Sequence, residues 1–126
     1  MEWLKISTTT EIVRVAVDEI VYILADGNYC DLMLANNSSH KMTFQLHYFE
    51  EYFQKLRNNP FSRVGRSLIV NKRHIRVVNV PDRVIRFGGH TLDTRIPAIR
   101  MAKLGRDSLQ KLKNELNEYE DGSTNN

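Results

Sequence analysis

The sequence contains one cysteine, three prolines and no long hydrophobic run. Cys30 alone excludes an intramolecular disulfide and cannot supply a thiolate metal cluster, a composition compatible with a reducing compartment. The first ten residues, MEWLKISTTT, contain no apolar stretch of signal-peptide length, and nowhere do about 18 apolar residues follow one another. We therefore expect a cytoplasmic protein that is not embedded in a membrane.

Motifs of catalysis and of metal binding are also missing. The histidines form no HExxH pair or other close metal-ligand spacing; they are His40, His47, His74 and His90. Neither Gly88-Gly89 nor the segment RVGRS has the context of a GxxxxGK[ST] or GxGxxG phosphate loop. We expect no enzyme activity, no cofactor and no metal, and binding is the function class that remains.

Acidic residues are scarce in one part of the chain. Between residues 57 and 106 there are twelve Lys or Arg but only two acids, a local net charge of +10. The remainder has six bases and thirteen acids, so the whole chain carries only +3. These cations are interleaved with Val, Ile and Phe, which a disordered basic tail lacks, and ten of the twelve are arginine. We expect an ordered surface suited to a polyanion, because guanidinium groups bind phosphate oxygens in pairs.

Short apolar runs separated by turn residues predict β-strands in the first and third quarters of the chain. In the first quarter the runs are IVRV, IVYIL and YCDLML, with turns at 26–28 and 36–39. Gly27 or Asn28 can supply the positive φ that a tight turn needs. The third quarter holds SLIV, HIRVVNV, RVIRF and TLDTRI, with turns at 81–82 and 88–89.

Two segments have apolar residues at helical spacing. The first stripe, ended by Asn58-Asn59-Pro60, consists of Leu46, Phe49, Phe53 and Leu56. The second consists of Leu109, Leu112 and Leu116, with Asp107 or Ser108 as the predicted N-cap. We expect one mainly-β domain over residues 1–120, with one short internal helix and a C-terminal helix, followed by a frayed tail over 121–126.

The segment FSRVGRSLIVNKRHIRVVNV, residues 61–80, carries five Arg or Lys, one His and no acid. We predict that it forms a β-hairpin with the cations on its polar face and at its turn. Strand alternation would place the apolar side chains in the core; they are Leu68, Val70, Ile75 and Val77. In this hypothesis some cations grip a polyanion, and we include Lys72 and Arg73 among them.

The pattern Phe61-x-Arg63-Val64-x-Arg66-Ser67-x-x-Val70-Asn71-x-x-x-Ile75 resembles the LytTR family of bacterial DNA-binding domains. The helix LHYFEEYFQKL before it and the segment VDEIVYILADGNY further upstream agree in order and spacing, so the resemblance covers about residues 10–104. It implies an elongated stack of antiparallel β-sheets, used in transcription regulators. It also implies contacts with double-stranded DNA from loops that enter successive major grooves.

Carried over to this sequence, the family's contact regions fall at three places. They are the loop with Asn28 and Tyr29, and its neighbour Cys30; the motif residues Arg63, Arg66 and Ser67; and Arg100 after the last strand. Arg66 and Arg100 are the residues that we expect to reach base edges, while other cations contact phosphates. Gly65 stands where the family often has His, and Ala98 lies where Ser is common, so the DNA target is expected to differ.

Other interpretations stay open at this point. The cations could form an ordinary solvated face, a basic face for an acidic protein, or an RNA or single-strand surface. The last would need exposed aromatic residues, and the basic region offers only Phe61 and Phe87. Among single residues, Arg63 could be a structural arginine over the helix, Asn71 a turn cap and Tyr29 a core residue.

The resemblance also suggests partners. We expect double-stranded DNA with paired half-sites, bound by a homodimer in one hypothesis. Only about nine residues precede the similarity, so no receiver domain is expected in this chain. A separate sensor or membrane partner is a further hypothesis.

Overall fold

The structure is a computed structural model, and it describes residues 2–89, 91–100 and 104–119. The described residues form ten strands, two α-helices and two short 3-10 helices, which confirms the mainly-β prediction. The elements, in chain order, are β1 (Trp3–Ser7), β2 (Ile12–Ala16), η1 (Val17–Glu19), β3 (Ile20–Asp26), β4 (Tyr29–Leu34), β5 (Ser39–Met42), α1 (Leu46–Gln54), β6 (Phe61–Val64), β7 (Leu68–Asn71), η2 (Lys72–His74), β8 (Ile75–Asn79), β9 (Val84–Phe87), β10 (Ile99–Arg100) and α2 (Arg106–Glu118).

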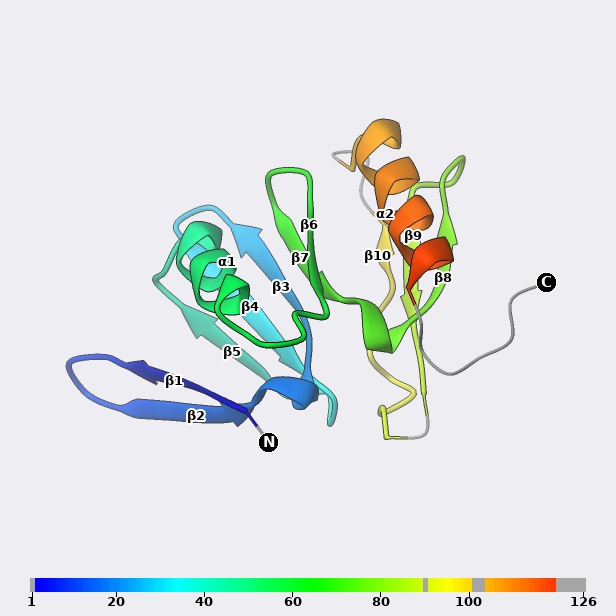
Figure 1. The fold of residues 1–126 in the computed structure, drawn as a ribbon. Helices are drawn as coiled ribbons and strands as arrows, with labels where there is room; N and C mark the ends of the chain where they lie inside the picture. Colours follow the sequence, from blue (N-terminus) through cyan, green and yellow to red (C-terminus); the bar gives the residue numbers. More distant parts are fainter. Residues whose placement is uncertain (1, 90, 101–103, 120–126) are drawn as a thin grey trace.

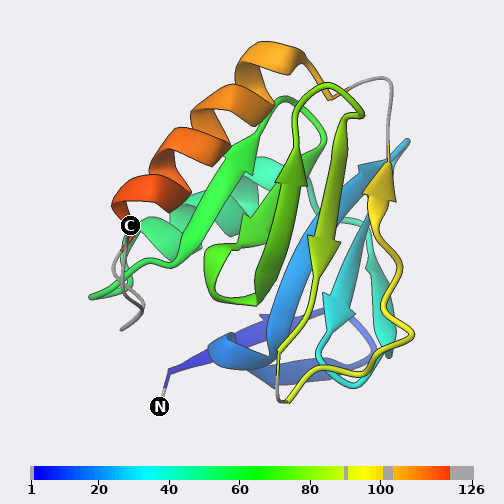
Figure 2. The same ribbon diagram turned by 90° about the vertical axis from the view of Figure 1, so that its right-hand side faces the viewer.

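The described strands form three antiparallel sheets, in the orders β1-β2, β5-β4-β3-β7-β6 and β10-β9-β8. Figure 1 shows β1, β2 and α1 on one side of the five-stranded sheet, and the three-stranded sheet with α2 on the other. Figure 2 shows the same stack turned by a right angle. Because both faces of the five-stranded sheet are covered, its strands separate two hydrophobic clusters.

Strand β7 shows how the sequence produces this arrangement. All four of its residues are buried, as expected for a strand with neighbours on both faces. Leu68 and Val70 belong to the cluster shared with the three-stranded sheet and α2, whereas Ile69 belongs to the cluster shared with β1, β2 and α1. Strand alternation therefore sends successive side chains into different cores.

Both helices use the predicted apolar stripes. Leu46, Phe49 and Phe53 of α1 are buried, and Phe53 stacks on Phe61 with ring centroids 3.8 Å apart. Leu109 and Leu112 of α2 are buried within the chain's own second cluster. The predicted N-cap is wrong: α2 begins at Arg106 after Gly105, and neither Asp107 nor Ser108 caps it.

The predicted hairpin over residues 61–80 is wrong. Strand β7 pairs with β6 and β3, whereas β8 pairs with β9 in a different sheet, and η2 carries the chain from one sheet to the other. The register of β8 shifts between Ile75 and Val77. This bulge turns Val77 to solvent, where it is 40% exposed, and Val78 packs against the second cluster instead.

Two further expectations need correction or completion. The segment TLDTRI is not a strand; its described residues form turns, although Leu92 and Ile96 are buried. The turn after β3 uses Gly27, with φ of +61°, to supply the positive φ.

The tail over 121–126 lies outside the described residues. No helix among the described residues is long and apolar enough to cross a membrane.

Candidate nucleic-acid interface

Several predicted contact regions meet at one end of the molecule, which we call the loop end. It comprises the turn at 27–28, the turn at 65–67, the end of β10 and the start of α2. Strand pairing aligns Leu24 with Leu68, and the amide of Ala25 donates to the carbonyl of Ser67 (2.7 Å), so the two turns lie side by side. Figure 2 shows the arrowhead of β10 pointing toward the same end.

A hollow of about 390 Å³ opens between these turns. Its lining includes four of the predicted site residues, which are Asn28, Tyr29, Arg63 and Arg66. Thr43 and Gln45, between β5 and α1, and His47, in the first turn of α1, complete the lining; the sequence analysis missed them. Polar residues just before a helix are a usual surface feature, so the local sequence carried no signal for them.

Arg66 lies at the tip of the turn between β6 and β7. It is exposed, and its side chain makes no hydrogen bond or ion pair within the described part of the chain. The preceding Gly65 has φ of +62°, a left-handed conformation that residues other than glycine and asparagine rarely adopt. The turn therefore projects an un-neutralised guanidinium group away from the sheet.

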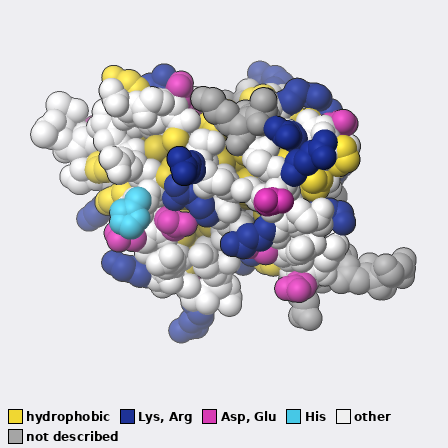
Figure 3. Space-filling view, turned by 90° about the horizontal axis from the view of Figure 1, so that it is seen from above, with side chains coloured by type: hydrophobic (Ala, Val, Ile, Leu, Met, Phe, Trp, Pro, Cys, Tyr) yellow, Lys and Arg dark blue, Asp and Glu magenta, His cyan; other side chains and the backbone are white. Residues whose placement is uncertain are grey.

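Other cations lie at this end as well. Arg100 ends β10, and Arg106 begins α2; both are exposed. A Cβ placed on Gly65 would lie 3.7 Å from Ser108 Oγ, so the start of α2 adjoins the Arg66 turn. Figure 3, which looks onto the loop end, shows Lys and Arg side chains spread across the face with Asp and Glu side chains between them.

The neutral predicted residues of the loop end are also accessible. Tyr29 is 45% exposed, so its alternative interpretation as a core residue is wrong. Lys41 Nζ lies 5.5 Å from the centroid of the Tyr29 ring, a cation–π arrangement that keeps a positive charge beside the ring. Asn28 is exposed, and Ser67 is half-buried. Cys30 is buried beneath these residues, and burial raises the pKa of its thiol, which disfavours the reactive thiolate.

Arg63 has a different environment from Arg66. Its Nε donates to the carbonyl of Gly65 (3.0 Å) and its Nη2 to the carbonyl of Arg66 (3.1 Å). Its Nη1 pairs with Glu50 Oε1 of α1 (3.3 Å). The side chain is half-buried, which agrees with the alternative interpretation of a structural arginine over the helix.

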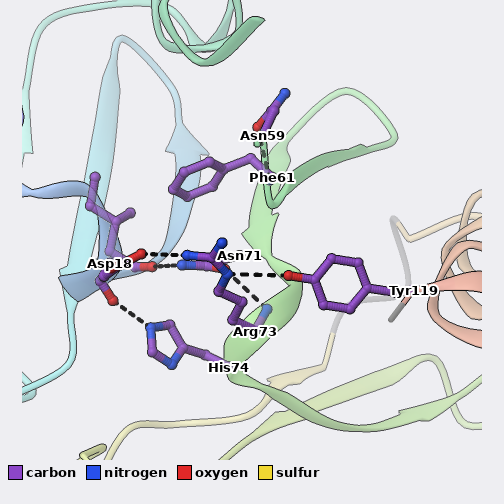
Figure 4. Close-up of polar contacts among 8 residues, drawn as sticks. Asp18, Asn59, Phe61, Asn71, Arg73, His74 and Tyr119 are labelled. Carbon is purple, nitrogen blue, oxygen red and sulfur yellow. Dashed lines mark hydrogen bonds and ion pairs between the residues drawn. The ribbon is translucent and has the colours of Figure 1, made fainter. Parts of the chain in front are cut away.

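Lys72 and Arg73 lie elsewhere. They belong to η2, at the opposite end of β7 from the Arg66 turn, in a region that we call the joint end. The joint end comprises η1, η2, Tyr119 and Asn71, the last residue of β7. Arg73 Nη1 pairs with Asp18 Oδ1 of η1 (2.6 Å), and Arg73 Nε donates to Tyr119 Oη (3.2 Å), as Figure 4 shows. Lys72 Nζ lies 5.2 Å from the centroid of the Tyr119 ring. These cations thus have partners within the chain.

Asn71 and His74 complete the joint end. Asn71 is fully buried; its Nδ2 donates to the carbonyl of Ile20 (2.9 Å), and its Oδ1 accepts from the Arg73 amide (3.0 Å). Its interpretation as a turn cap is therefore confirmed. His74 Nε2 donates to the backbone oxygen of Asp18 (2.7 Å). These hydrogen bonds link η1 and the start of β3 to η2, where the chain crosses from the five-stranded to the three-stranded sheet.

The acidic and metal-binding side chains of the described residues do not gather into a metal site. Among the described residues, no group of three or more His, Cys, Asp or Glu side chains could hold a metal ion. Asp93 pairs with Arg95, whose side-chain and backbone hydrogen bonds lower the pKa of the Asp93 carboxyl to about 2. Arg95 is therefore another neutralised cation. The chemistry available at the loop end is anion binding and hydrogen bonding.

Comparison with known proteins identifies the family and the fold of this chain. The family model of the LytTr DNA-binding domain matches residues 10–117, which includes β2 through most of α2. No curated protein similar to this chain was found. A solved structure with the same fold is the LytTr DNA-binding domain of a methyl-accepting/DNA response regulator from Bacillus cereus. The two sequences are 17% identical, and the TM-score is 0.65. The match covers 94% of the present chain and 99% of the Bacillus cereus domain.

The resemblance noted in the sequence thus extends further than expected, through the second leucine stripe. The family is a family of DNA-binding domains and not one of enzymes. Because its model matches most of the chain, the protein belongs to the LytTR family of DNA-binding domains.

Proposed function

We propose that this domain binds double-stranded DNA with sequence specificity, through the loop end, as a cytoplasmic transcription regulator. The observation that carries the proposal is the meeting of Asn28, Tyr29 and Arg66 around one hollow, with the Arg66 charge unpaired within the described residues. Unpaired guanidinium groups beside amide and hydroxyl groups are what a duplex groove requires.

In this proposal the residues of the loop end have separate roles. Arg66 and Arg100 project from different sheets and donate paired hydrogen bonds to guanine edges in the major groove. Asn28 bonds to a base edge, while Ser67 and Arg106 contact phosphates and fix the register. The contacts come from turns and element ends, because both α-helices bury their apolar faces against the sheets.

Selection of bound duplexes from a random pool tests the proposal. We expect enrichment of a defined sequence, and enrichment of two half-sites at fixed spacing would indicate two bound copies. Affinity should fall steeply with rising salt, because each phosphate contact releases counterions. A pool that shows no enrichment, or an affinity insensitive to salt, would contradict the proposal.

Substitution of Arg66 sharpens the test. Arg66→Ala should cost about 1–3 kcal/mol of binding free energy for the selected duplex and relax preference at one base position. Arg57→Ala, an exposed arginine beyond the end of α1, is the matched control and should bind like the unsubstituted protein. Equal binding by both variants would exclude Arg66 as a base-reading residue.

The two aromatic residues of the basic region, Phe61 and Phe87, give no support to a single-strand binding function. Phe61 is buried and stacks on Phe53, and Phe87 is half-buried beside Tyr22, with ring centroids 5.2 Å apart. Neither of these rings is placed to stack on bases. Single-stranded DNA and RNA of the selected sequence should therefore compete poorly with the duplex.

A further inference from the structure

The turn that carries Arg66 is supported from below by one side chain. Arg63 donates to two successive carbonyls of this turn, those of Gly65 and Arg66, at 3.0 and 3.1 Å. All the nitrogen atoms of its guanidinium group are used, because the remaining one pairs with Glu50 at 3.3 Å. Three of its five N–H donors are used in this way, so only two remain for a base or a phosphate.

The geometry of this turn explains why such support is needed. Gly65 has φ of +62°, and glycine is the residue with the largest backbone freedom to lose on folding. No other side chain in the described part of the chain bonds to the Gly65 or Arg66 carbonyl. The Arg63 fork therefore restrains the backbone of this turn.

Glu50 ties this support to the body of the domain. It lies on α1, one turn before the buried Phe53, so its position is set by packing against the first hydrophobic cluster. The Arg63 and Glu50 side chains are about one-third exposed, at 31% and 34%, so water screens their attraction in part. Charge and direction both matter, since the carboxylate orients the guanidinium toward the turn.

We propose that Arg63 and Glu50 are positioning residues: they brace the turn so that Arg66 is presented to DNA in one orientation, and Arg63 itself does not contact DNA. The inference rests on the proposed function of the loop end and changes the role assigned to Arg63 from sequence. Pre-organised groups bind more tightly because less conformational freedom is lost on binding.

A double-mutant cycle on the full chain tests this role. Arg63→Lys keeps the charge but cannot reproduce a planar three-way fork, and we expect a roughly three- to ten-fold loss of affinity for the selected duplex. In an Arg66→Ala background the same substitution should cost less than about two-fold, since the braced group is gone. Glu50→Gln, which keeps an acceptor, should give a smaller loss, and Arg57→Lys should give none.

Two results of the cycle would overturn the proposal. An equal loss in both backgrounds would mean that Arg63 acts independently of Arg66. A salt dependence of binding that becomes shallower by about one phosphate in Arg63→Gln, which removes the charge, would mean that Arg63 itself grips DNA. Thermal unfolding of each variant checks that the measured species is folded.

A measurement on the free protein tests the support of the turn by Arg63 separately from the proposed DNA binding. In the free protein, NMR order parameters of the Gly65 and Arg66 amides should fall in Arg63→Lys, while that of Gly27 in the neighbouring turn should not. Unchanged order at Gly65 and Arg66 would overturn the brace even if the domain selects a duplex. Loss of order in a protein that selects no duplex would retain the brace and reject DNA binding by the loop end.

Discussion

The loop end and the joint end lie at opposite ends of β7, and both contain basic residues from the same stretch of sequence. At the joint end, Arg73 is neutralised by Asp18 and bonded to Tyr119. At the loop end, the side chains of Arg66 and Arg100 have no partner within the described residues. A difference in partners therefore separates two groups of cations that look alike in the sequence.

This comparison shows that the density of arginine along a chain does not locate a binding surface. A guanidinium group that already holds a carboxylate has fewer N–H donors left for a phosphate, and its charge is partly compensated. The hydrogen bonds at the joint end join parts of the chain that are about 50 residues apart, from Asp18 to Arg73 to Tyr119. These cations have partners within the chain, whereas the side chains of Arg66 and Arg100 have none among the described residues.

The largest effect is expected at the joint end, from Asn71→Ala. This change removes both hydrogen bonds of a fully buried side chain and leaves the Ile20 carbonyl and the Arg73 amide unpaired. We expect a loss of about 2–4 kcal/mol in the free energy of unfolding, measured by urea denaturation. Affinity for duplex DNA per folded molecule should stay unchanged.

A matched control for this prediction is Asn79→Ala. Asn79 Oδ1 accepts from the Asp82 amide in an exposed turn, where water can replace the lost bond. Its cost should be only about 0.5–1 kcal/mol. Similar costs for the two asparagines would show that the joint end does not depend on the buried amide.

At the loop end, Gly65→Ala should have the next largest effect. The added Cβ meets only Ser108 Oγ at 3.7 Å, an ordinary contact, so the cost comes from the left-handed backbone. We expect about 1–2 kcal/mol of lost stability, together with weaker binding to the selected duplex. Gly65→Asn should cost less, because asparagine tolerates this conformation; equal costs would indicate a steric cause instead.

A smaller effect tests whether the joint end contacts DNA. Arg73→Gln removes an ion pair whose side chains are 43% and 63% exposed, so the stability loss should be only about 0–1 kcal/mol. Binding to duplex DNA and its salt dependence should not change, and the same holds for Lys72→Ala. A loss of affinity for all duplexes in either variant would indicate that Arg73 or Lys72 contacts phosphates, as the sequence suggested. The joint end would then also be part of the DNA-binding surface.

The smallest effect concerns Asp93, which pairs with Arg95. The pKa of the Asp93 carboxyl is lowered to about 2, mainly by hydrogen bonds from Arg95. A lowered pKa in the folded state means that the contribution to stability is present above the ordinary pKa of Asp, about 4, and is lost as pH falls toward 2. In Arg95→Gln, NMR titration should find this pKa near its ordinary value; an unchanged pKa would exclude the pairing.

Much of the fold could be predicted from local patterns. Alternating apolar runs and the stripe Leu46, Phe49 and Phe53 identified most strands and the internal helix, because burial imposes these periods directly on the sequence. The motif around Arg63 and Arg66 identified the family. Strands β1 and β5 were missed because neither contains a run of three apolar residues.

Pairings between distant residues could not be predicted in the same way. Which sheet β8 joins depends on tertiary packing, and a single bulge near Arg76 reverses the faces of Val77 and Val78. Likewise, no residue adjacent to Arg73 in the sequence predicts its pairing with Asp18, which lies 55 residues away. The role of each cation follows from such contacts.

The burial of the five-stranded sheet on both faces has a consequence for how such domains diversify. Its strands are fixed by two independent layers, so the turns that extend beyond them carry almost none of the packing. If the proposed function holds, exchange of Arg66, Ser67 or Asn28 should alter the ligand preference while the architecture persists. The same property makes the domain a candidate for retargeting by turn grafting.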